Sequence, residues 1–217
     1  MPSSSVLLST AYFAPIPFYA LTIKSVNIYI EQFENYTKQT FRNRCEILGA
    51  NGIISLIVPV VKSRKPKILI KDLRISYDVD WQRNHWRTIF SAYGSSPYLD
   101  YFKDDIFPLF EVKEKFLLDY NLKIHDTICE LLEIENNTIL TSDFEKNSED
   151  FENFREVISP KNKLINHQFQ NEKYTQVFSE KTGFIPNLSI LDLLFNEGPN
   201  SFSIMANCIV NVKKPVK

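Results

Sequence analysis

The tripeptide Ala50-Asn51-Gly52 is the feature that most constrains the fold of this chain. It lies between two apolar, strand-like stretches, residues 45–48 and 53–60. Asn-Gly between two such stretches is the strongest short-range signal for a β-hairpin, because these residues tolerate the backbone angles of a tight turn. We therefore expect an antiparallel strand pair, which would hold the side chains that precede the turn on a rigid frame.

The order of the other elements predicts the fold class. Further strands are expected at residues 6–13, 26–30 and 67–77, with a short helical turn at 18–22 between the first two. Helices are expected at residues 81–93, 98–110, 114–132 and 189–195, where apolar residues recur at helical spacing. This order predicts an α/β or α+β fold, with a mixed β-sheet from the N-terminal third covered by C-terminal helices. A Rossmann-like arrangement is one form it could take, although the first linker is short for a parallel βαβ unit.

The length of 217 residues favours a single domain. We divide it into four parts by composition and periodicity. These are a strand-rich part at 1–78, a helical part at 80–134, a polar acidic segment at 143–173 that we expect to be loop-rich, and a C-terminal helical part at 174–217.

The charge distribution argues against nucleic acid as the partner and favours a small anion. The net charge is −1, whereas proteins that bind DNA usually carry a marked basic excess. Residues 36–88 nevertheless hold eleven Lys or Arg residues against four Asp or Glu residues, and residues 143–156 hold six acidic residues. One region could therefore attract an anionic small molecule while another repels it.

The cysteines and the N-terminal stretch indicate the compartment. Cys45, Cys129 and Cys208 are isolated thiols, which predicts no disulfide framework, no zinc site and a reducing environment. The apolar N-terminal stretch has no cationic residue before Lys24 and is interrupted by prolines, which fits neither a signal peptide nor a membrane span. We expect a cytoplasmic protein, and no motif points to a particular cofactor.

A segment rich in cations and amides precedes the hairpin and is the first candidate site. Its candidate substrate-binding residues are Lys38, Gln39, Arg42, Asn43 and Arg44. In a strand, Lys38, Arg42 and Arg44 would share one face, and in a helix Lys38 and Arg42 would still align. Arginine has a planar donor fork that suits carboxylate or phosphate, so the segment could bind an anion. The alternative is a solvated edge strand whose charges discourage aggregation.

A second candidate site lies in the first long helix. His85 and Trp81 would share a face at a spacing of four residues, so His85 could act as a general base beside an aromatic wall formed by Trp81 and Tyr93. Glu31 or Glu34 could supply an acidic partner. The alternative is that these aromatic residues belong to the core and that His85 only forms hydrogen bonds.

Familiar catalytic motifs are missing from the sequence. No glycine precedes Gly49, so the first strand, loop and helix cannot carry a glycine-rich phosphate-binding loop. No GxSxG motif is present, which excludes the usual nucleophile elbow.

Four blocks of the sequence resemble the WbqC-like protein family: AYFAPIPFYA, YTKQTFRNRCEILGANGIISLIVPV, WQRNHWRTIFSAYGSSPYLDYF and GFIPNLSILDLLFNEGP. The resemblance covers most of the chain, and its more specific parts are the Arg-Asn-Arg and Trp…His-Trp stretches. It implies a role in the biosynthesis of bacterial O-antigen and other surface polysaccharides, with glycine transfer suggested for some members. It identifies no catalytic residues.

The resemblance and the candidate residues together favour a transferase that moves an amino-acyl or acyl group onto a nucleotide-linked sugar. His85 would deprotonate the sugar nucleophile, and the cation-amide segment would hold a phosphate or carboxylate. Two alternatives stay open. One is a non-catalytic binding or scaffold protein of a polysaccharide pathway, and the other is a nucleotidyltransferase-like enzyme.

Overall fold

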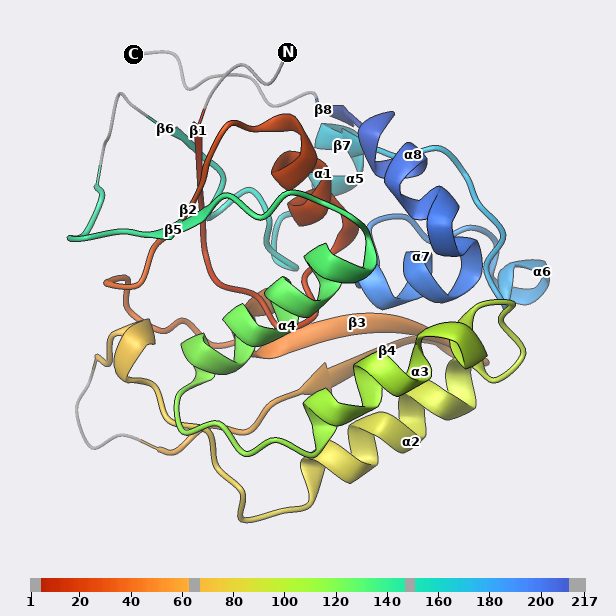
Figure 1. Ribbon diagram of the computed structural model, residues 1–217, viewed down its shortest axis with the longest axis horizontal. Helices are drawn as coiled ribbons and strands as arrows, with labels where there is room; N and C mark the ends of the chain where they lie inside the picture. Colours follow the sequence, from red (N-terminus) through yellow and green to blue (C-terminus); the bar gives the residue numbers. More distant parts are fainter. Residues whose placement is uncertain (1–4, 63–66, 147–150, 211–217) are drawn as a thin grey trace.

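A computed structural model describes residues 5–62, 67–146 and 151–210 of the chain. Its centre is a four-stranded sheet in the order β5-β2-β1-β6 (Figure 1). The strands are β1 (Ser5–Leu8), β2 (Ile28–Ile30), β5 (Thr138–Leu140) and β6 (Phe151–Asn153). All pairings within this sheet are parallel, so the four carboxyl ends lie along one edge. The predicted α/β class is confirmed, and the parallel sheet is compatible with a Rossmann-like arrangement.

Helix α1 (Ile16–Lys24) connects β1 to β2 and makes the first unit a parallel βαβ unit. The helix is longer than the turn expected at residues 18–22. Its residues 16–22 are all buried, so the sequence lacks the polar face by which a surface helix is recognised. The first strand is shorter than expected, because Phe13 has a φ of 37°, which no strand residue adopts.

The strands β5 and β6 were not predicted from the sequence. Each has only three residues, too few to establish an alternation of apolar and polar side chains. Strand β6 lies within the acidic segment that we expected to be loop-rich. Only two of the four strands of the parallel sheet therefore come from the N-terminal third of the chain.

The predicted hairpin is confirmed as β3 (Arg44–Gly49) and β4 (Gly52–Ile57), with Gly49 opposite Gly52. Within the turn, Gly52 alone has a positive φ, of 111°. The left-handed position is therefore taken by Gly52 and not by Asn51, as in a type I turn followed by a glycine bulge.

The strand expected at residues 67–77 is not formed. A 3₁₀ turn at Ile70–Asp72 interrupts it, and isolated bridges pair Val60 with Ile75 and Arg74 with Phe116. Apolar alternation here reflects a chain that packs against the core from two sides of a turn, since Ile70, Leu73 and Ile75 are all buried. Arg64 and Lys65, which contribute to the basic count of this region, lie outside the described residues.

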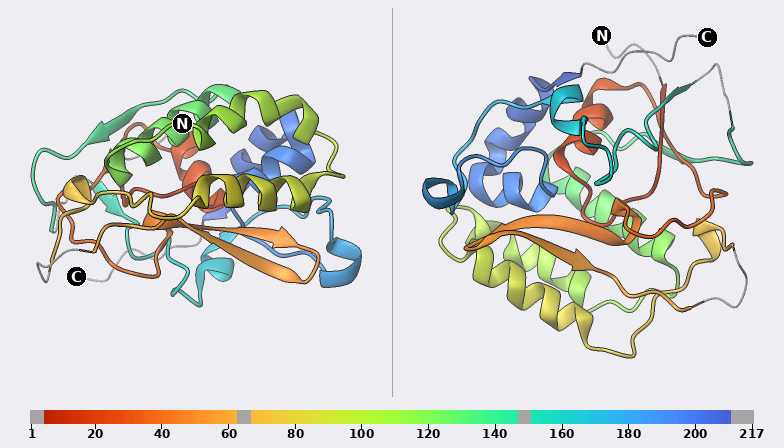
Figure 2. Two further views of the ribbon diagram at one scale, coloured as in Figure 1. Left: turned by 90° about the horizontal axis from the view of Figure 1, so that it is seen from below. Right: turned by 180° about the vertical axis from the view of Figure 1, so that it is seen from behind.

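Helices α2 (Trp81–Tyr93), α3 (Leu99–Ile106) and α4 (Leu117–Leu131) follow the hairpin, close to where the sequence predicted them. Figure 2 shows these three helices together on one side of the β3–β4 hairpin. Helices α7 (Ile190–Glu197) and α8 (Ser201–Ala206) pack against α1. The remaining short elements are α5 (Ile165–Gln168), β7 (Phe169–Gln170), α6 (Ser179–Thr182) and β8 (Ile209–Val210).

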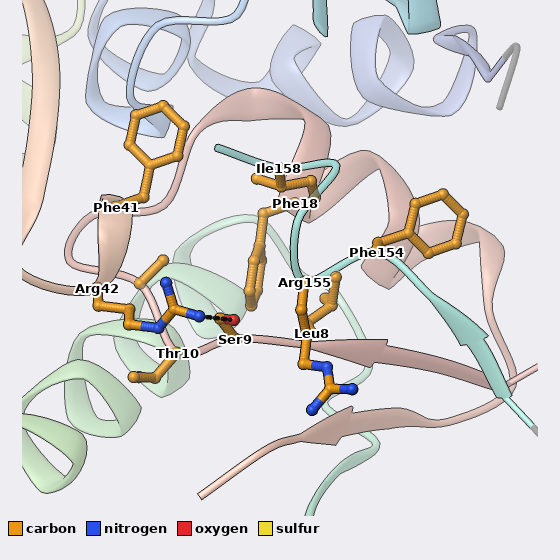
Figure 3. Close-up of a pocket in the computed structure, with 10 residues that line it drawn as sticks. Leu8, Ser9, Thr10, Phe18, Phe41, Arg42, Phe154, Arg155 and Ile158 are labelled. Carbon is orange, nitrogen blue, oxygen red and sulfur yellow. Dashed lines mark hydrogen bonds between the residues drawn. The ribbon is translucent and has the colours of Figure 1, made fainter. Parts of the chain in front are cut away.

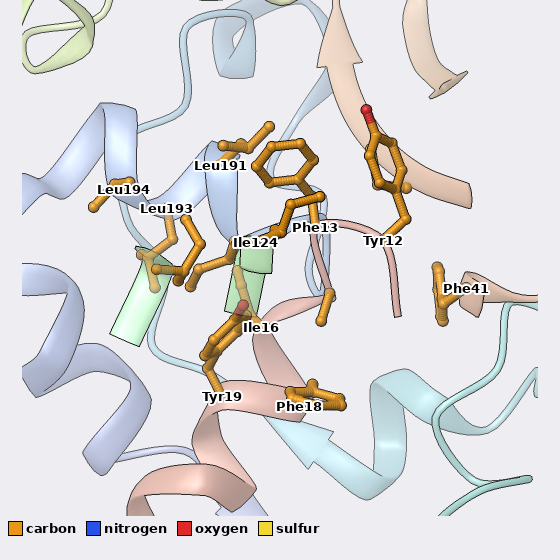
Figure 4. Close-up of a cluster of buried hydrophobic side chains, with 14 of the residues drawn as sticks. Tyr12, Phe13, Ile16, Phe18, Tyr19, Phe41, Ile124, Leu191, Leu193 and Leu194 are labelled. Atoms are coloured by element: carbon orange, nitrogen blue, oxygen red, sulfur yellow. The ribbon is translucent and has the colours of Figure 1, made fainter. Parts of the chain in front are cut away.

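The hydrophobic core joins the N-terminal and C-terminal parts of the chain. In Figure 4, Phe13 and Ile16 from the β1–α1 region lie close to Ile124 of α4 and Leu191 of α7. In the part of the chain that the structure describes, no helix combines the length and apolar character needed to cross a membrane.

Candidate functional site

The order of the strands creates a switch point at the carboxyl end of β1. The chain crosses from β1 to β2 on one side, whereas β6 pairs with β1 on the other side. In open parallel sheets, ligands bind in the crevice outside the carboxyl ends of the strands at such a point, because the loops there leave in opposite directions. A binding site is therefore expected beside the ends of β1 and β6.

Polar side chains follow each of the four strands at this edge, and most of them are buried. They are Ser9 and Thr10 after β1, Glu31 and Glu34 after β2, Thr141 after β5, and Arg155 after β6. A buried charge is costly unless it is paired and hydrogen-bonded. Each of the two glutamates is paired with an arginine, and the two pairs differ in what they leave free.

Arg42 and Glu34 form the first pair. Arg42 Nε donates to Glu34 Oε1 at 2.7 Å and Arg42 Nη2 donates to Glu34 Oε2 at 2.6 Å. Nη2 also donates to Ser9 Oγ at 2.8 Å, and the Ser9 hydroxyl donates to Glu34 Oε2 at 3.1 Å. Arg42 is only 4% exposed. Its third nitrogen, Nη1, has no hydrogen-bond partner among the described residues, so it remains available for an anionic ligand.

The local fold holds the backbone of Arg42 in place. Residues Phe41–Asn43 form a 3₁₀ turn, and the Phe41 carbonyl accepts a hydrogen bond from the Tyr12 amide. The Arg42 carbonyl accepts from Asn121 Nδ2 at 2.8 Å, and Asn43 Nδ2 donates to the Val58 carbonyl at 2.8 Å. The guanidinium is therefore positioned by contacts with the β1–α1 loop, helix α4 and the chain after β4.

Arg155 and Glu31 form the second pair, at 3.3 Å between Arg155 Nη1 and Glu31 Oε2. Here all three guanidinium nitrogens have partners, because Nε donates to Asn153 Oδ1 and Nη2 donates to the Glu145 carbonyl. Glu31 is fully buried and also accepts from the Thr141 hydroxyl. This pair closes the sheet edge and leaves no donor for a ligand.

A small hollow lies beside Arg42 at the switch point. It is lined by the chain after β1, by Phe18 and Phe41, and by residues that follow β6. In Figure 3 the Arg42 guanidinium lies next to Ser9, the Phe18 ring stands between Arg42 and Arg155, and the Arg155 guanidinium points away. The hollow encloses about 10 Å³, which is room for one water-sized group.

The expected cationic face of the segment before the hairpin is not formed. Lys38 and Gln39 are exposed in a loop, where Gln39 has a φ of 59°. Arg42 points into the hollow, Asn43 is used in the structural contact to Val58, and Arg44 belongs to β3 with its Nε buried and unpaired. The 3₁₀ turn breaks the alternation on which the prediction of a shared face depended. Of the five residues, Arg42 lies at the switch point.

His85 lies in the core and is not among the residues that line the hollow. Its Nδ1 is 3.0 Å from the Tyr12 hydroxyl, and the backbone of Ile57 hydrogen-bonds the ring. Burial lowers the pKa of His85 from its ordinary value of 6.5 to about 4, so the ring is neutral near pH 7. With partners on both sides, the imidazole has no free nitrogen for a substrate, and we assign it no catalytic step.

Trp81 and Tyr93 also lie in the core. The Trp81 ring packs edge-on against Tyr12 and Tyr120. The Tyr93 hydroxyl donates to Asp192 Oδ1 at 2.8 Å and accepts from the Leu48 amide at 3.3 Å. Neither residue lines the hollow beside Arg42.

Ser9 and Arg155 were not selected from the sequence, and Glu34 was considered only as a partner for His85. The usable signal is positional: a polar residue that directly follows a buried strand lies at the sheet edge. Ser9 follows the apolar end of β1, but Arg155 follows a strand that the sequence did not reveal.

Comparison with known proteins places this fold and edge in a family. The model of the WbqC-like protein family matches residues 11–159 and 156–204. The uncharacterized protein Rv1507c of Mycobacterium tuberculosis is 24% identical over 196 residues, covering 80% of this chain and 84% of the relative. No solved structure matches the chain. Because the family model covers most of the sequence, the chain belongs to the WbqC-like protein family.

Proposed function

We propose that this protein is a transferase of surface-polysaccharide biosynthesis that moves an amino-acyl or acyl group onto a nucleotide-linked sugar. It would act in the cytoplasm. The observation that carries the proposal is Arg42 Nη1, an unpaired cationic donor beside a hollow at the switch point of a parallel sheet. A phosphate of the sugar nucleotide or a carboxylate of the donor supplies the matching acceptor.

Ser9 would contribute to the orientation of the substrate. Its hydroxyl donates to Glu34 and accepts from Arg42, so a lone pair remains that can accept from an N–H or O–H of the ligand. In the transfer, the acyl carbon leaves the donor group and forms a new bond to the sugar amine or hydroxyl. The proton of that nucleophile passes to the leaving group.

Entry of a substrate would require a rearrangement of side chains. A phosphate or carboxylate group is larger than the single water-sized space that is enclosed now. The Phe18 ring, which stands between Arg42 and Arg155, is the side chain whose rotation would widen the hollow (Figure 3).

The nucleotidyltransferase alternative has less support. Enzymes that bind a pyrophosphate at the first helix use free N–H groups at its N-terminus. Here the Ile16 amide donates to the Leu188 carbonyl, Pro17 has no N–H, and the Phe18 amide donates to Pro15. These first positions of α1 leave no N–H for a phosphate.

The test is a screen of nucleotide-linked sugars against amino-acyl and acyl donors, with product mass as the readout. We expect a mass increase equal to the transferred group, and a rate about 10–100-fold lower for Arg42→Lys, because lysine cannot both pair with Glu34 and present a second donor. Arg155→Lys is the matched control, since Arg155 is also a buried, paired arginine but has no free nitrogen.

Two results would contradict the proposal. One is the absence of product with every donor and acceptor pair. The other is an equal rate for wild type and Arg42→Lys. If the protein bound a sugar nucleotide tightly without forming product, the non-catalytic binding role would replace the transferase.

A further inference from the structure

A second hollow lies on the other side of the chain segment that follows β1. It shares Thr10, Ala11 and Phe18 with the hollow beside Arg42, and it is otherwise lined by residues of α1, β2 and α4. Most of its wall is apolar, and it also encloses about 10 Å³. Its polar residues include Thr10 and Asn121, which are 3% and 1% exposed.

Asn121 presents a buried acceptor that has no donor. Its Nδ2 donates to Thr10 Oγ1 at 3.1 Å and to the Arg42 carbonyl at 2.8 Å. A carbonyl only accepts, so the amide cannot be turned around, and Oδ1 is fixed as the remaining atom. Within the described residues, Asn121 Oδ1 is buried without any hydrogen-bond partner. Native structures leave few such groups unsatisfied, so this one requires an explanation.

Thr10 presents the complementary group. Its Oγ1 accepts from Asn121, and its hydroxyl proton has no acceptor among the described residues. A donor from Thr10 and an acceptor from Asn121 therefore lie next to each other at a hollow the size of one water. The other polar residue of this wall, His125, is already engaged, because its Nε2 lies 2.9 Å from Thr138 Oγ1.

We propose that Thr10 and Asn121 form a subsite for one hydroxyl group of a ligand whose anionic group binds Arg42. A hydroxyl accepts one hydrogen bond and donates another, which matches this pair of groups. It also reproduces the hydrogen bonds of a water that it displaces, so the exchange loses little. Asn121 connects the two groups directly, because the same amide holds both Thr10 and the backbone of Arg42.

The subsite specifies the ligand class. The ligand is a phosphorylated or carboxylated molecule with a hydroxyl group a few bonds from the anion, as in a sugar phosphate. The assignment of that hydroxyl to the sugar of a nucleotide-linked sugar rests on the proposed function. The subsite itself does not, because it requires binding only.

The experiment compares glycerol 3-phosphate with n-propyl phosphate, which has the same phosphate and carbon chain but no hydroxyl. Binding is followed by the side-chain amide resonance of Asn121 in labelled protein, and dissociation constants are taken from the titration. We expect wild type to bind glycerol 3-phosphate roughly 5–10-fold more tightly, the gain typical of one well-formed hydrogen bond. The Asn121 resonance should shift with glycerol 3-phosphate and much less with n-propyl phosphate.

Two variants test the residues separately. Asn121→Leu and Thr10→Val each remove one member of the pair, and each should bring the two dissociation constants to within about twofold while n-propyl phosphate still binds. Thr22→Val is the matched control, because Thr22 is a buried threonine whose hydroxyl donates to Phe18 within its own helix. It should keep the wild-type preference. If Asn121→Leu does not fold, Thr10→Val and the wild-type resonance carry the test.

Equal affinities in wild type, or a preference that survives both variants, would overturn the subsite and leave a buried water as the partner of Asn121. These outcomes are distinct from failure of the transferase screen, since no donor is present and no product is formed. A preference without any transfer would support the subsite and contradict the proposed function.

Discussion

The pairing of Arg42 with Glu34 makes a specific prediction about single residues. Glu34→Gln would leave a buried guanidinium without its counter-charge, which typically costs about 3–5 kcal/mol. We expect the free energy of unfolding in urea to fall by that amount. The double variant Arg42→Met/Glu34→Leu should recover most of the loss, because it removes both charges and keeps the volume.

The control for this prediction is an exposed ion pair. Lys103 and Asp100 are 2.7 Å apart on the surface of α3, and the side chain of Asp100 is 87% exposed. Asp100→Asn should change the unfolding free energy by less than about 1 kcal/mol. A similar small change for Glu34→Gln would mean that Arg42 is stabilised by solvent and not by Glu34.

The same pair shows how far the sequence can predict a site residue by residue. Arg42 was predicted as an anion-binding residue, because its side-chain chemistry can be inferred from the residue alone. Its neighbours were not, since Glu34 and Ser9 lie 8 and 33 positions away in the sequence. His85 was predicted as a base because a histidine beside indoles has two physical explanations, and the sequence does not say which side of the helix faces solvent.

At the scale of elements, the hairpin turn makes the clearest prediction. Gly52 has a φ of 111°, where a residue with a Cβ is strained, although an added Cβ would meet no atom within 4 Å. Gly52→Ala should therefore lower the free energy of unfolding by about 1–2 kcal/mol through backbone strain alone. Thermal unfolding followed by circular dichroism would measure it.

Ala50→Ser is the control in the same turn, because residue 50 is exposed and is not among the residues with a positive φ. It should leave the melting temperature nearly unchanged. If Gly52→Ala were equally silent, the turn would have to tolerate a different backbone geometry from the one described, and the bulge assignment would fail.

The elements that could be predicted are those whose signal is local. The hairpin has its own turn sequence, and α2 and α4 have long amphipathic patterns, so all three were found. The strands β5 and β6 have three residues each and form only because β2 and β1 offer unpaired edges. Tertiary pairing decides such strands, and this is why the edge that carries Arg155 was missed.

At the scale of the whole molecule, Asp192 connects distant parts of the chain. This fully buried carboxylate on α7 accepts from the hydroxyls of Tyr93 on α2 and Tyr174, and from Gln176 Nε2. Burial raises the pKa of Asp192, and the three donors oppose that effect. Since the folded-state pKa is raised, the contribution of Asp192 to stability falls as the pH rises above its unfolded value of 3.8.

Two buried histidines give the molecule the opposite dependence on pH. Burial lowers the pKa of His85 and of His125 from 6.5 to about 4. Between these values the unfolded chain binds protons that the folded chain does not, so the stability from these neutral rings is complete above pH 6.5 and is lost as the pH falls towards 4. At roughly 1.4 kcal/mol for each pH unit and each fully shifted histidine, the two together are an upper bound of several kcal/mol.

We therefore expect the free energy of unfolding in urea to decrease steeply between pH 6.5 and pH 4.5. The variant His85→Gln/His125→Gln keeps polar side chains at both positions but has no imidazole to titrate, so its slope over this range should be much shallower. Because Asp192 and the other carboxylates remain in both proteins, the difference between the two slopes isolates the histidines. Parallel slopes would show that at least one ring is protonated in the folded protein, which would return a charged imidazole to the mechanism.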